Sequence, residues 1–160
     1  MTTVLAIDPG TSRSAWLRFD GRRPAGFGIT ANDVLVRALR TGGLPDVVVI
    51  EEIRSYGMAV GQETFDTARW TGRFQERIAP MEATLLKRSD VVRHLGVVTH
   101  GPNRTTADAG IHAALIDRFG GVGGKAAAVG LKARQGPLYG VTRDMWAALA
   151  VAVAWADGVR

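Results

Sequence analysis

Short hydrophobic runs separated by turn residues fill the first part of the chain. Residues 4–7 are β-branched and aliphatic, and they end at Asp8-Pro9-Gly10, which is a turn signal. Residues 14–19 and 25–30 have the composition of two further strands, and the sequence Gly-Arg-Arg-Pro at 21–24 fits a hairpin loop between them. The pattern therefore predicts three strands at the start of the fold.

Later hydrophobic positions follow a buried-strand pattern or a helical one. Residues 46–53 contain four consecutive aliphatic side chains, which indicates a central strand covered on both faces, and 83–86 predict another strand. Helical patterns are expected at 33–39 after an Asn32 or Asp33 cap, 62–79, 90–95 after Ser89, 107–119 after Thr105 or Thr106, and 143–157 after Thr142. This order predicts an α/β fold with a mixed central sheet and helices on both of its faces.

The length of 160 residues, without a long linker, predicts one domain spanning residues 1–160. Residues 120–136 are rich in Gly, Ala and basic residues without a clear period, so we expect a mobile basic loop there. The N-terminus does not resemble a signal peptide, and the longest apolar run, 145–156, is too short to cross a bilayer. We therefore expect a cytoplasmic protein that does not bind membranes.

The net charge and the absence of cysteine narrow the possible partners and chemistry. A formal net charge of +5 favours a polyanionic partner such as nucleic acid, although an ordinary basic protein has the same balance. The chain contains no cysteine, which excludes disulfides, thiolate metal ligands and a cysteine nucleophile. Any bound metal must therefore be held mainly by carboxylates.

Three acidic residues from distant parts of the chain are candidates for one site. Asp8 follows the first predicted strand, Glu51 ends the central strand, and Asp144 lies in the first turn of the last helix. If the first and fourth strands are neighbours, Asp8 and Glu51 emerge at the same edge of the sheet, where open α/β sheets bind ligands. Glu52 points to the opposite face from Glu51, so we expect it to be solvated or paired with an arginine.

Clustered carboxylates suit a reaction that uses divalent cations. Like charges side by side destabilise each other unless a cation lies between them, and Mg²⁺ and Mn²⁺ prefer hard oxygen ligands. Such ions can activate a water molecule and stabilise the leaving oxygen in phosphodiester cleavage. We therefore expect Mg²⁺, with Mn²⁺ as a substitute, and no organic cofactor. Each acid alone also has an ordinary structural explanation, such as a turn or the N-terminus of a helix.

Three segments of the sequence resemble RuvC, particularly the RuvC-like resolvases of bacteriophages. They are LAIDPGTSRSAW, VVVIEEI and GVTRDMWAALAVAVAW, and together they extend over nearly the whole chain. The resemblance implies an RNase H-like fold, a homodimer, and Mg²⁺-dependent nicking of a four-way (Holliday) DNA junction in a bacterial cytoplasm. It also implies that Asp8, Glu51 and Asp144 are the catalytic, metal-binding residues.

One position departs from the RuvC pattern, which has two metal-binding side chains one turn apart on the last helix. In one register Asp144 is the first position and Ala147 the second; in the other, Asp144 is the second and Val141 the first, so one carboxylate is missing either way. Asp108 and Glu52 are candidates to supply the missing carboxylate, although neither lies in a matching motif. The departure leaves open whether the site holds one metal or two.

The residues expected to contact DNA lie in four segments. The resemblance suggests that a side chain after Glu51 enters the junction, and an exposed aromatic there can stack on a base. Arg69, Arg73 and Arg77 recur at helical spacing beside an apolar stripe of Phe65, Trp70, Phe74 and Ile78, which fits core or a dimer interface. The candidates are Tyr56, Met58, Arg69, Arg73, Lys87, Arg88, Lys125, Lys132 and Arg134.

Several interpretations remain open from the residues alone. Tyr56 could instead pack under its loop, and the arginines could form a solvated helix face with Asp66 and Glu76. None of the histidines has metal-ligand spacing, and His112 is expected to be packed or on the surface. Two other functions share the same acids: another RNase H-like nuclease, acting on RNA–DNA hybrids or flaps, and a non-catalytic junction-binding protein.

Overall fold

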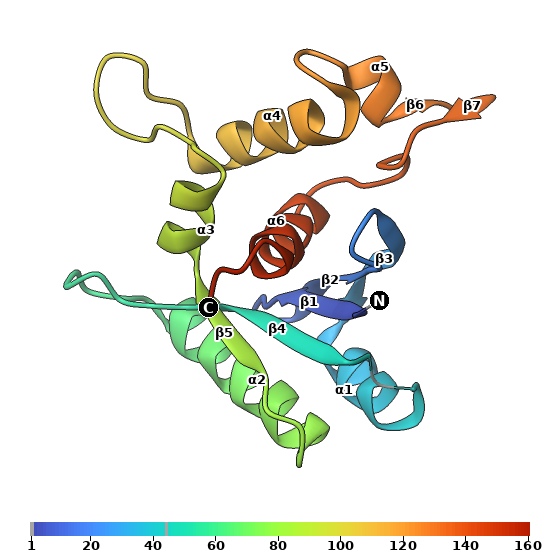
Figure 1. The fold of residues 1–160 in the computed structure, drawn as a ribbon. Helices are drawn as coiled ribbons and strands as arrows, with labels where there is room; N and C mark the ends of the chain where they lie inside the picture. The colour runs from blue at the N-terminus through green and yellow to red at the C-terminus, as the bar shows by residue number, and fades with distance from the viewer. Residues whose placement is uncertain (1, 44) are drawn as a thin grey trace.

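A five-stranded mixed sheet forms the centre of the computed structural model, which describes residues 2–43 and 45–160 (Figure 1). The strand order is β3-β2-β1-β4-β5; β2 runs antiparallel to β1 and β3, whereas β4 and β5 run parallel to β1. The strands are β1 (Val4–Asp8), β2 (Arg13–Phe19), β3 (Pro24–Ala31), β4 (Val47–Glu52) and β5 (Thr84–Lys87). The predicted mixed sheet is confirmed, and β1 and β4 are neighbours, which is the condition for Asp8 and Glu51 to emerge at the same end of the sheet.

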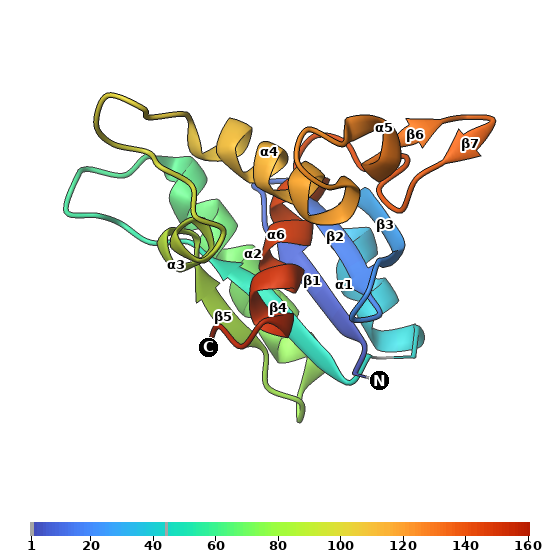
Figure 2. The ribbon, with the colours of Figure 1, turned by 45° about the horizontal axis from the view of Figure 1, so that its top comes forward.

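Helices cover both faces of the sheet (Figures 1 and 2). On one face, Leu5, Ile7 and Ile50 pack against α1 (Asn32–Thr41) and α2 (Gln62–Ile78). The other face packs against the helices α3 (Arg88–His94), α4 (Ala107–Gly120) and α6 (Met145–Ala156). Because α6 lies between the sheet and α4, it is apolar around nearly its whole circumference.

Three predicted helix caps are wrong, at α1, α3 and α6, and the one at α4 is confirmed. The N-cap of α1 is Ala31, because the buried Asn32 side chain instead accepts a hydrogen bond from the Ser14 hydroxyl at 2.6 Å. Ser89 does not cap α3, which begins one residue earlier, at Arg88. Thr106 caps α4 as predicted, accepting a hydrogen bond from the Ala109 amide at 3.2 Å.

The last helix begins later than predicted, and this changes the position of one candidate residue. Its N-cap is Asp144 rather than Thr142, and its first helical residue is Met145. Arg143, just before it, has a positive φ of 50°, so the chain turns sharply there and cannot continue the helix backwards. Asp144 therefore lies at the entrance to the helix rather than within its first turn.

The segment expected to be a mobile loop contains short regular elements. These are α5 (Lys125–Ala128), β6 (Gly130–Leu131) and β7 (Arg134–Gln135), and the two strands form a small hairpin of their own. Elements of two to four residues are too short to show hydrophobic periodicity. The mobility of this segment stays a prediction. Within the described residues, no helix is both long and apolar enough for a bilayer crossing.

Candidate active site

Asp8 and Glu51 lie side by side at the carboxyl ends of β1 and β4. The parallel register places Ile7 opposite Ile50, so the next residue of each strand is one of the two acids. Both side chains alternate with residues of the α1–α2 face and therefore point to the face that α6 covers. Glu51 is nearly enclosed, with 14% of its side chain exposed.

The turn after Asp8 is fixed by two buried polar side chains. The Asn32 amide donates to the Gly10 carbonyl at 2.9 Å, and the Gly10 amide donates to the Ser14 hydroxyl at 3.2 Å. A Cβ at Gly10 would lie 2.2 Å from the Arg13 carbonyl oxygen, so only glycine fits. These contacts hold the backbone just beyond Asp8 and thereby define where β1 ends.

The entrance to α6 brings a third acid to the same place. Asp144 and Asp8 line one cavity of about 380 Å³, together with Asp108 and Ala147. The N-terminus of a helix favours a negative charge, so Asp144 is placed where its carboxylate is stabilised. The three predicted site residues, Asp8, Glu51 and Asp144, are thus brought together at one edge of the sheet.

Asp108 is the fourth acid of this region, and Glu52 is not part of it. Asp108 lies in the first turn of α4, lines the cavity of Asp8, and has 86% of its side chain exposed. Glu52 points to the other face and pairs with Arg54 at 2.7 Å, as expected from its position in the strand. Of the two candidates for the missing carboxylate, only Asp108 is near the other acids.

A guanidinium group lies among these carboxylates. Arg88 follows β5, and its Nη1 donates to the Glu51 carboxylate at 3.2 Å and 3.4 Å, while its Nη2 contacts Asp108. The sequence predicted that Arg88 and Lys87 contact DNA, because they precede a helix. That reasoning missed the acids, because the neighbouring position of β4 and β5 is a long-range property of the sheet.

His112 and Arg143 also line the cavity, and neither was a predicted site residue. The His112 ring packs edge to face on Trp146, with 4.3 Å between the ring centroids. His112 belongs to α4 and Trp146 to α6, so their packing joins two helices beside the acids. No periodic or spacing signal in the sequence distinguishes this histidine from a simple packed one.

The close acids shift each other's protonation. The pKa of Asp8 is raised from 3.8 to about 8, first because burial disfavours its charged form and then because Glu51 and Asp144 are near. Burial also raises the pKa of Glu51, and the positive charge of Arg88 opposes that rise. Without a further cation, the site therefore holds a proton at neutral pH.

The carboxylate oxygens of this site are the kind of ligand that a hard divalent cation prefers, but they are not arranged around one point. Carboxylate oxygens are the preferred ligands of Mg²⁺ and Mn²⁺. Across residues 2–43 and 45–160, no three acidic or histidine side chains are spaced as ligands of one ion. Arg88 bridges Glu51 and Asp108 instead. Side chains at this edge must rotate before a cation is held.

The loop after β4 displays the two side chains predicted to enter DNA. Tyr56 is 67% exposed and Met58 76% exposed, so neither packs beneath the loop. The Ser55 hydroxyl donates to the Met58 carbonyl at 3.2 Å, which closes a turn around Tyr56. Both side chains are therefore exposed on the loop that follows β4.

The predicted arginine face of α2 is divided among three environments. Arg69 pairs with Asp66 at 3.4 Å, and Arg73 lies over the Trp70 ring at 4.3 Å from its centroid. Arg77 donates from Nε to the Val36 carbonyl of α1 at 3.2 Å. The apolar stripe is divided too: Phe74 and Ile78 belong to the core, Trp70 is partly buried, and Phe65 is exposed.

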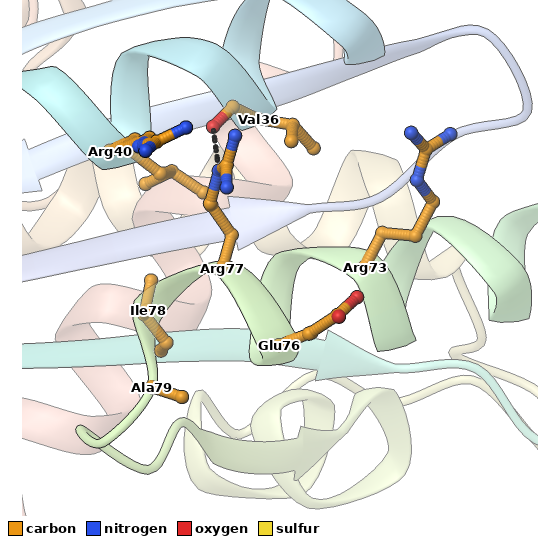
Figure 3. Close-up of a pocket in the computed structure, with 8 residues that line it drawn as sticks. Val36, Arg40, Arg73, Glu76, Arg77, Ile78 and Ala79 are labelled. Carbon is orange, nitrogen blue, oxygen red and sulfur yellow. Dashed lines mark hydrogen bonds between the residues drawn. The ribbon is translucent and has the colours of Figure 1, made fainter.

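Arg73 and Arg77 line a cavity of about 620 Å³ between α1 and α2, together with Arg40 of α1 (Figure 3). Glu76 is the one acidic side chain of its lining, and none of the three arginines forms an ion pair within the part of the chain that the structure describes. Helix α2 runs from the carboxyl end of β4 back towards the start of β5, and its last turns line the cavity. The cavity therefore lies towards the end of the sheet opposite the acids.

The remaining predicted DNA contacts are basic residues at other surfaces. Lys125, Lys132 and Arg134 are all exposed in the α5–β7 region. Lys87 is partly buried and ends β5, one residue before Arg88. These positions are compatible with phosphate contacts, which stay predictions.

Two solved structures of Thermus thermophilus RuvC share this fold. The first is RuvC in complex with a Holliday junction substrate, with a TM-score of 0.60 and 14% identity, covering 96% of this chain and 92% of that one. The second is RuvC itself, with a TM-score of 0.59 and 15% identity, covering 95% and 92%. No protein-family model and no curated protein matches the sequence. At this identity the similarity concerns the fold, and it confirms the predicted RNase H-like architecture.

Proposed function

We propose that this chain, with the fold of RuvC, is a metal-dependent endonuclease that cleaves four-way or other branched DNA by phosphodiester hydrolysis. The observation that supports the proposal most is the meeting of Asp8, Glu51 and Asp144 from three distant segments. A cluster of acids costs stability through mutual repulsion, so a protein without cation chemistry gains nothing from it.

The three acids differ in how firmly the fold holds their side chains. Asp8 and Glu51 are set by the parallel register of β1 and β4, so their positions are rigid. Asp144 is exposed at the helix entrance and is free to turn towards a cation beside Asp8. Bound there, Mg²⁺ or Mn²⁺ would supply the positive charge that activates water and stabilises the leaving oxygen. Asp8 must release its proton before it becomes a ligand.

DNA binding in this proposal uses basic and aromatic surface residues. The net charge of +5 attracts the phosphate backbone without regard to sequence. Tyr56, beside the acidic edge, would stack on an unpaired base at the branch point. A homodimer belongs to the proposal because a four-way junction offers two equivalent strands, and the exposed Phe65 on α2 is a candidate for its interface.

The test is a panel of labelled DNA and hybrid substrates cleaved in Mg²⁺ and in Mn²⁺. We expect nicks in a synthetic four-way junction and none in linear duplex. Cleavage of an RNA–DNA hybrid or a flap, with the junction intact, would keep the metal chemistry and replace the substrate. Tight junction binding without cleavage in either metal would contradict the proposed activity and favour a non-catalytic binding protein.

A further inference from the structure

Arg88 is held by the sheet at the edge where the acids gather. It is the first residue of α3 and follows directly on β5, whose Leu86 lies opposite Glu51 of β4. The side chain returns to the end of β4 and is two-thirds enclosed, with 33% exposure. Its position is therefore set by strand pairing rather than by a flexible surface loop.

The guanidinium is the cation that directly bridges two of the four acids. It contacts both oxygens of the Glu51 carboxylate and one oxygen of Asp108. An arginine keeps its charge at any physiological pH, and its planar fork suits carboxylates and phosphates alike. Its presence also lowers the pKa of Asp8 and Glu51, which opposes the effect of burial.

The two bonds of Arg88 differ in how easily they are released. Glu51 is almost enclosed, with 14% exposure, so its partner is costly to remove. Asp108 is 86% exposed, and an ion pair of such an exposed group contributes little because water screens it. Arg88 can therefore leave Asp108 for another anion while it keeps Glu51.

The side chains at the start of α6 explain why a resident cation is useful here. Ala147, one turn after Asp144 on α6, lines the cavity, and Val141 precedes the helix and is buried and apolar, so neither offers an oxygen donor as a second ligand. A second divalent ion would have to be held without that carboxylate. The guanidinium supplies positive charge at this edge without any added ligand.

We propose that Arg88 takes the place of one divalent cation, so that this site uses a single metal ion together with the Arg88 guanidinium. This inference rests on the proposed metal-dependent cleavage. In the complex, Arg88 keeps its bond to Glu51, exchanges Asp108 for an oxygen of the DNA phosphate, and fixes that phosphate beside the ion. Arg88 is then a charge-supplying and positioning residue of the site.

The experiment counts Mn²⁺ ions bound per chain, by calorimetry and by electron paramagnetic resonance, in the full-length protein without DNA. We expect one ion in the wild type, and a second, weaker ion in Arg88→Gln, where Glu51 and Asp108 are freed. Arg93→Gln is the matched control, because Arg93 lies on the same helix, is 78% exposed, and pairs with Asp90 rather than with the acids of the site. The control should bind one ion with unchanged affinity.

A second variant keeps the test decisive if Arg88→Gln does not fold, which circular dichroism reports. Arg88→Lys retains the charge but not the fork, so it should bind one ion and hold junction DNA at least several-fold more weakly. Two ions in the wild type, a second ion in Arg88→Lys, or an Arg88→Gln protein that still binds one ion with unchanged affinity would each overturn the inference. A wild type that binds no ion would contradict the proposed function itself.

Discussion

The acidic edge and the arginine cavity are two clusters of like charge built in different ways. At the acidic edge, Asp8 and Glu51 are fixed by strand register and covered by α6, and Arg88 is their counter-charge. The cavity is lined by Arg40 of α1 and by Arg73, Glu76 and Arg77 of α2 (Figure 3).

The difference lies in burial. Desolvation shifts the pKa of the acids strongly, so their cluster needs a cation or a proton to be stable. Arg40 and Arg73 are exposed to water, which screens their repulsion, and Arg77 is bonded to the Val36 carbonyl, so the cavity is stable without a ligand. In the proposed function, the acidic edge carries the chemistry and the cavity would contribute long-range attraction for DNA.

Among the proposed substitutions, Asp8→Asn should reduce junction cleavage most. Removing this carboxylate removes a ligand whose charge acts on the reacting phosphate, so we expect junction cleavage to fall by about 10³-fold or more. The metal-free protein should melt at the same or a higher temperature, because asparagine is neutral without the proton uptake that the buried Asp8 carboxyl requires on folding. Asp33→Asn, which changes an exposed acid paired with Arg37, is the control and should cleave normally. A lower melting temperature of Asp8→Asn would show that Asp8 is structural.

The raised pKa of Asp8 predicts an unusual dependence of stability on pH. The folded state holds a proton on Asp8 up to about pH 8, whereas the unfolded chain releases it near pH 4. The Asp8 contribution to stability without metal therefore falls as the pH rises from about 4 to 8. Melting temperatures in EDTA should show this slope in the wild type relative to Asp8→Asn, and saturating Mg²⁺ should flatten it. Parallel curves for the two proteins would refute the assigned pKa.

Tyr56→Ala should weaken junction binding without changing the fold. A stacked base contributes about 1–3 kcal/mol to binding, so the Kd should rise by roughly tenfold. Tyr56 is 67% exposed, so the melting temperature should stay constant. Val98→Ala, which truncates an exposed apolar side chain in another loop, is the control for surface changes. Equal junction affinity of Tyr56→Ala and wild type would remove Tyr56 from the interface.

Arg73→Gln should give the smallest effect and tests the role of the cavity. If Arg73 neutralises one phosphate, the slope of log affinity against log salt concentration should become shallower by about 0.9. Arg37→Gln serves as the control, since Arg37 is already paired with Asp33 at 2.8 Å. Loss of cleavage by Arg73→Gln at saturating DNA would contradict this role, because it would show that the cavity takes part in the chemistry and not only in DNA binding.

The sheet and the three principal acids follow from local sequence patterns. The apolar run of β4 is recognisable because it is buried on both faces, and a charge at its end is conspicuous. The sequence left the pairing of the first and fourth strands as a condition, and the structure meets it, which places Asp8 beside Glu51. Likewise, the apolar run at 145–156 predicts a buried helix, and α6 does lie between the sheet and α4.

Side-chain partners between distant segments could not be predicted in the same way. Arg88 and Asp108 are separated by 20 residues and meet because α4 packs against α3, whose first residue is Arg88. The prediction of an Asn32 cap was wrong for a similar reason, because the Asn32 side chain accepts a buried hydrogen bond from Ser14 on β2. Short polar residues have several local options, and tertiary packing selects among them.

Anomalous scattering from Mn²⁺-soaked crystals of the wild type would test directly whether Asp8, Glu51 and Asp144 form the metal site. We predict a peak within about 2–2.5 Å of carboxylate oxygens of Asp8, Glu51 or Asp144, with Arg88 still bonded to Glu51. The Asp8→Asn protein, soaked in the same way, should lose that peak. A saturating soak that leaves the acidic edge without a peak, in a protein that cleaves junctions in Mn²⁺, would contradict the assignment of these acids as the metal site.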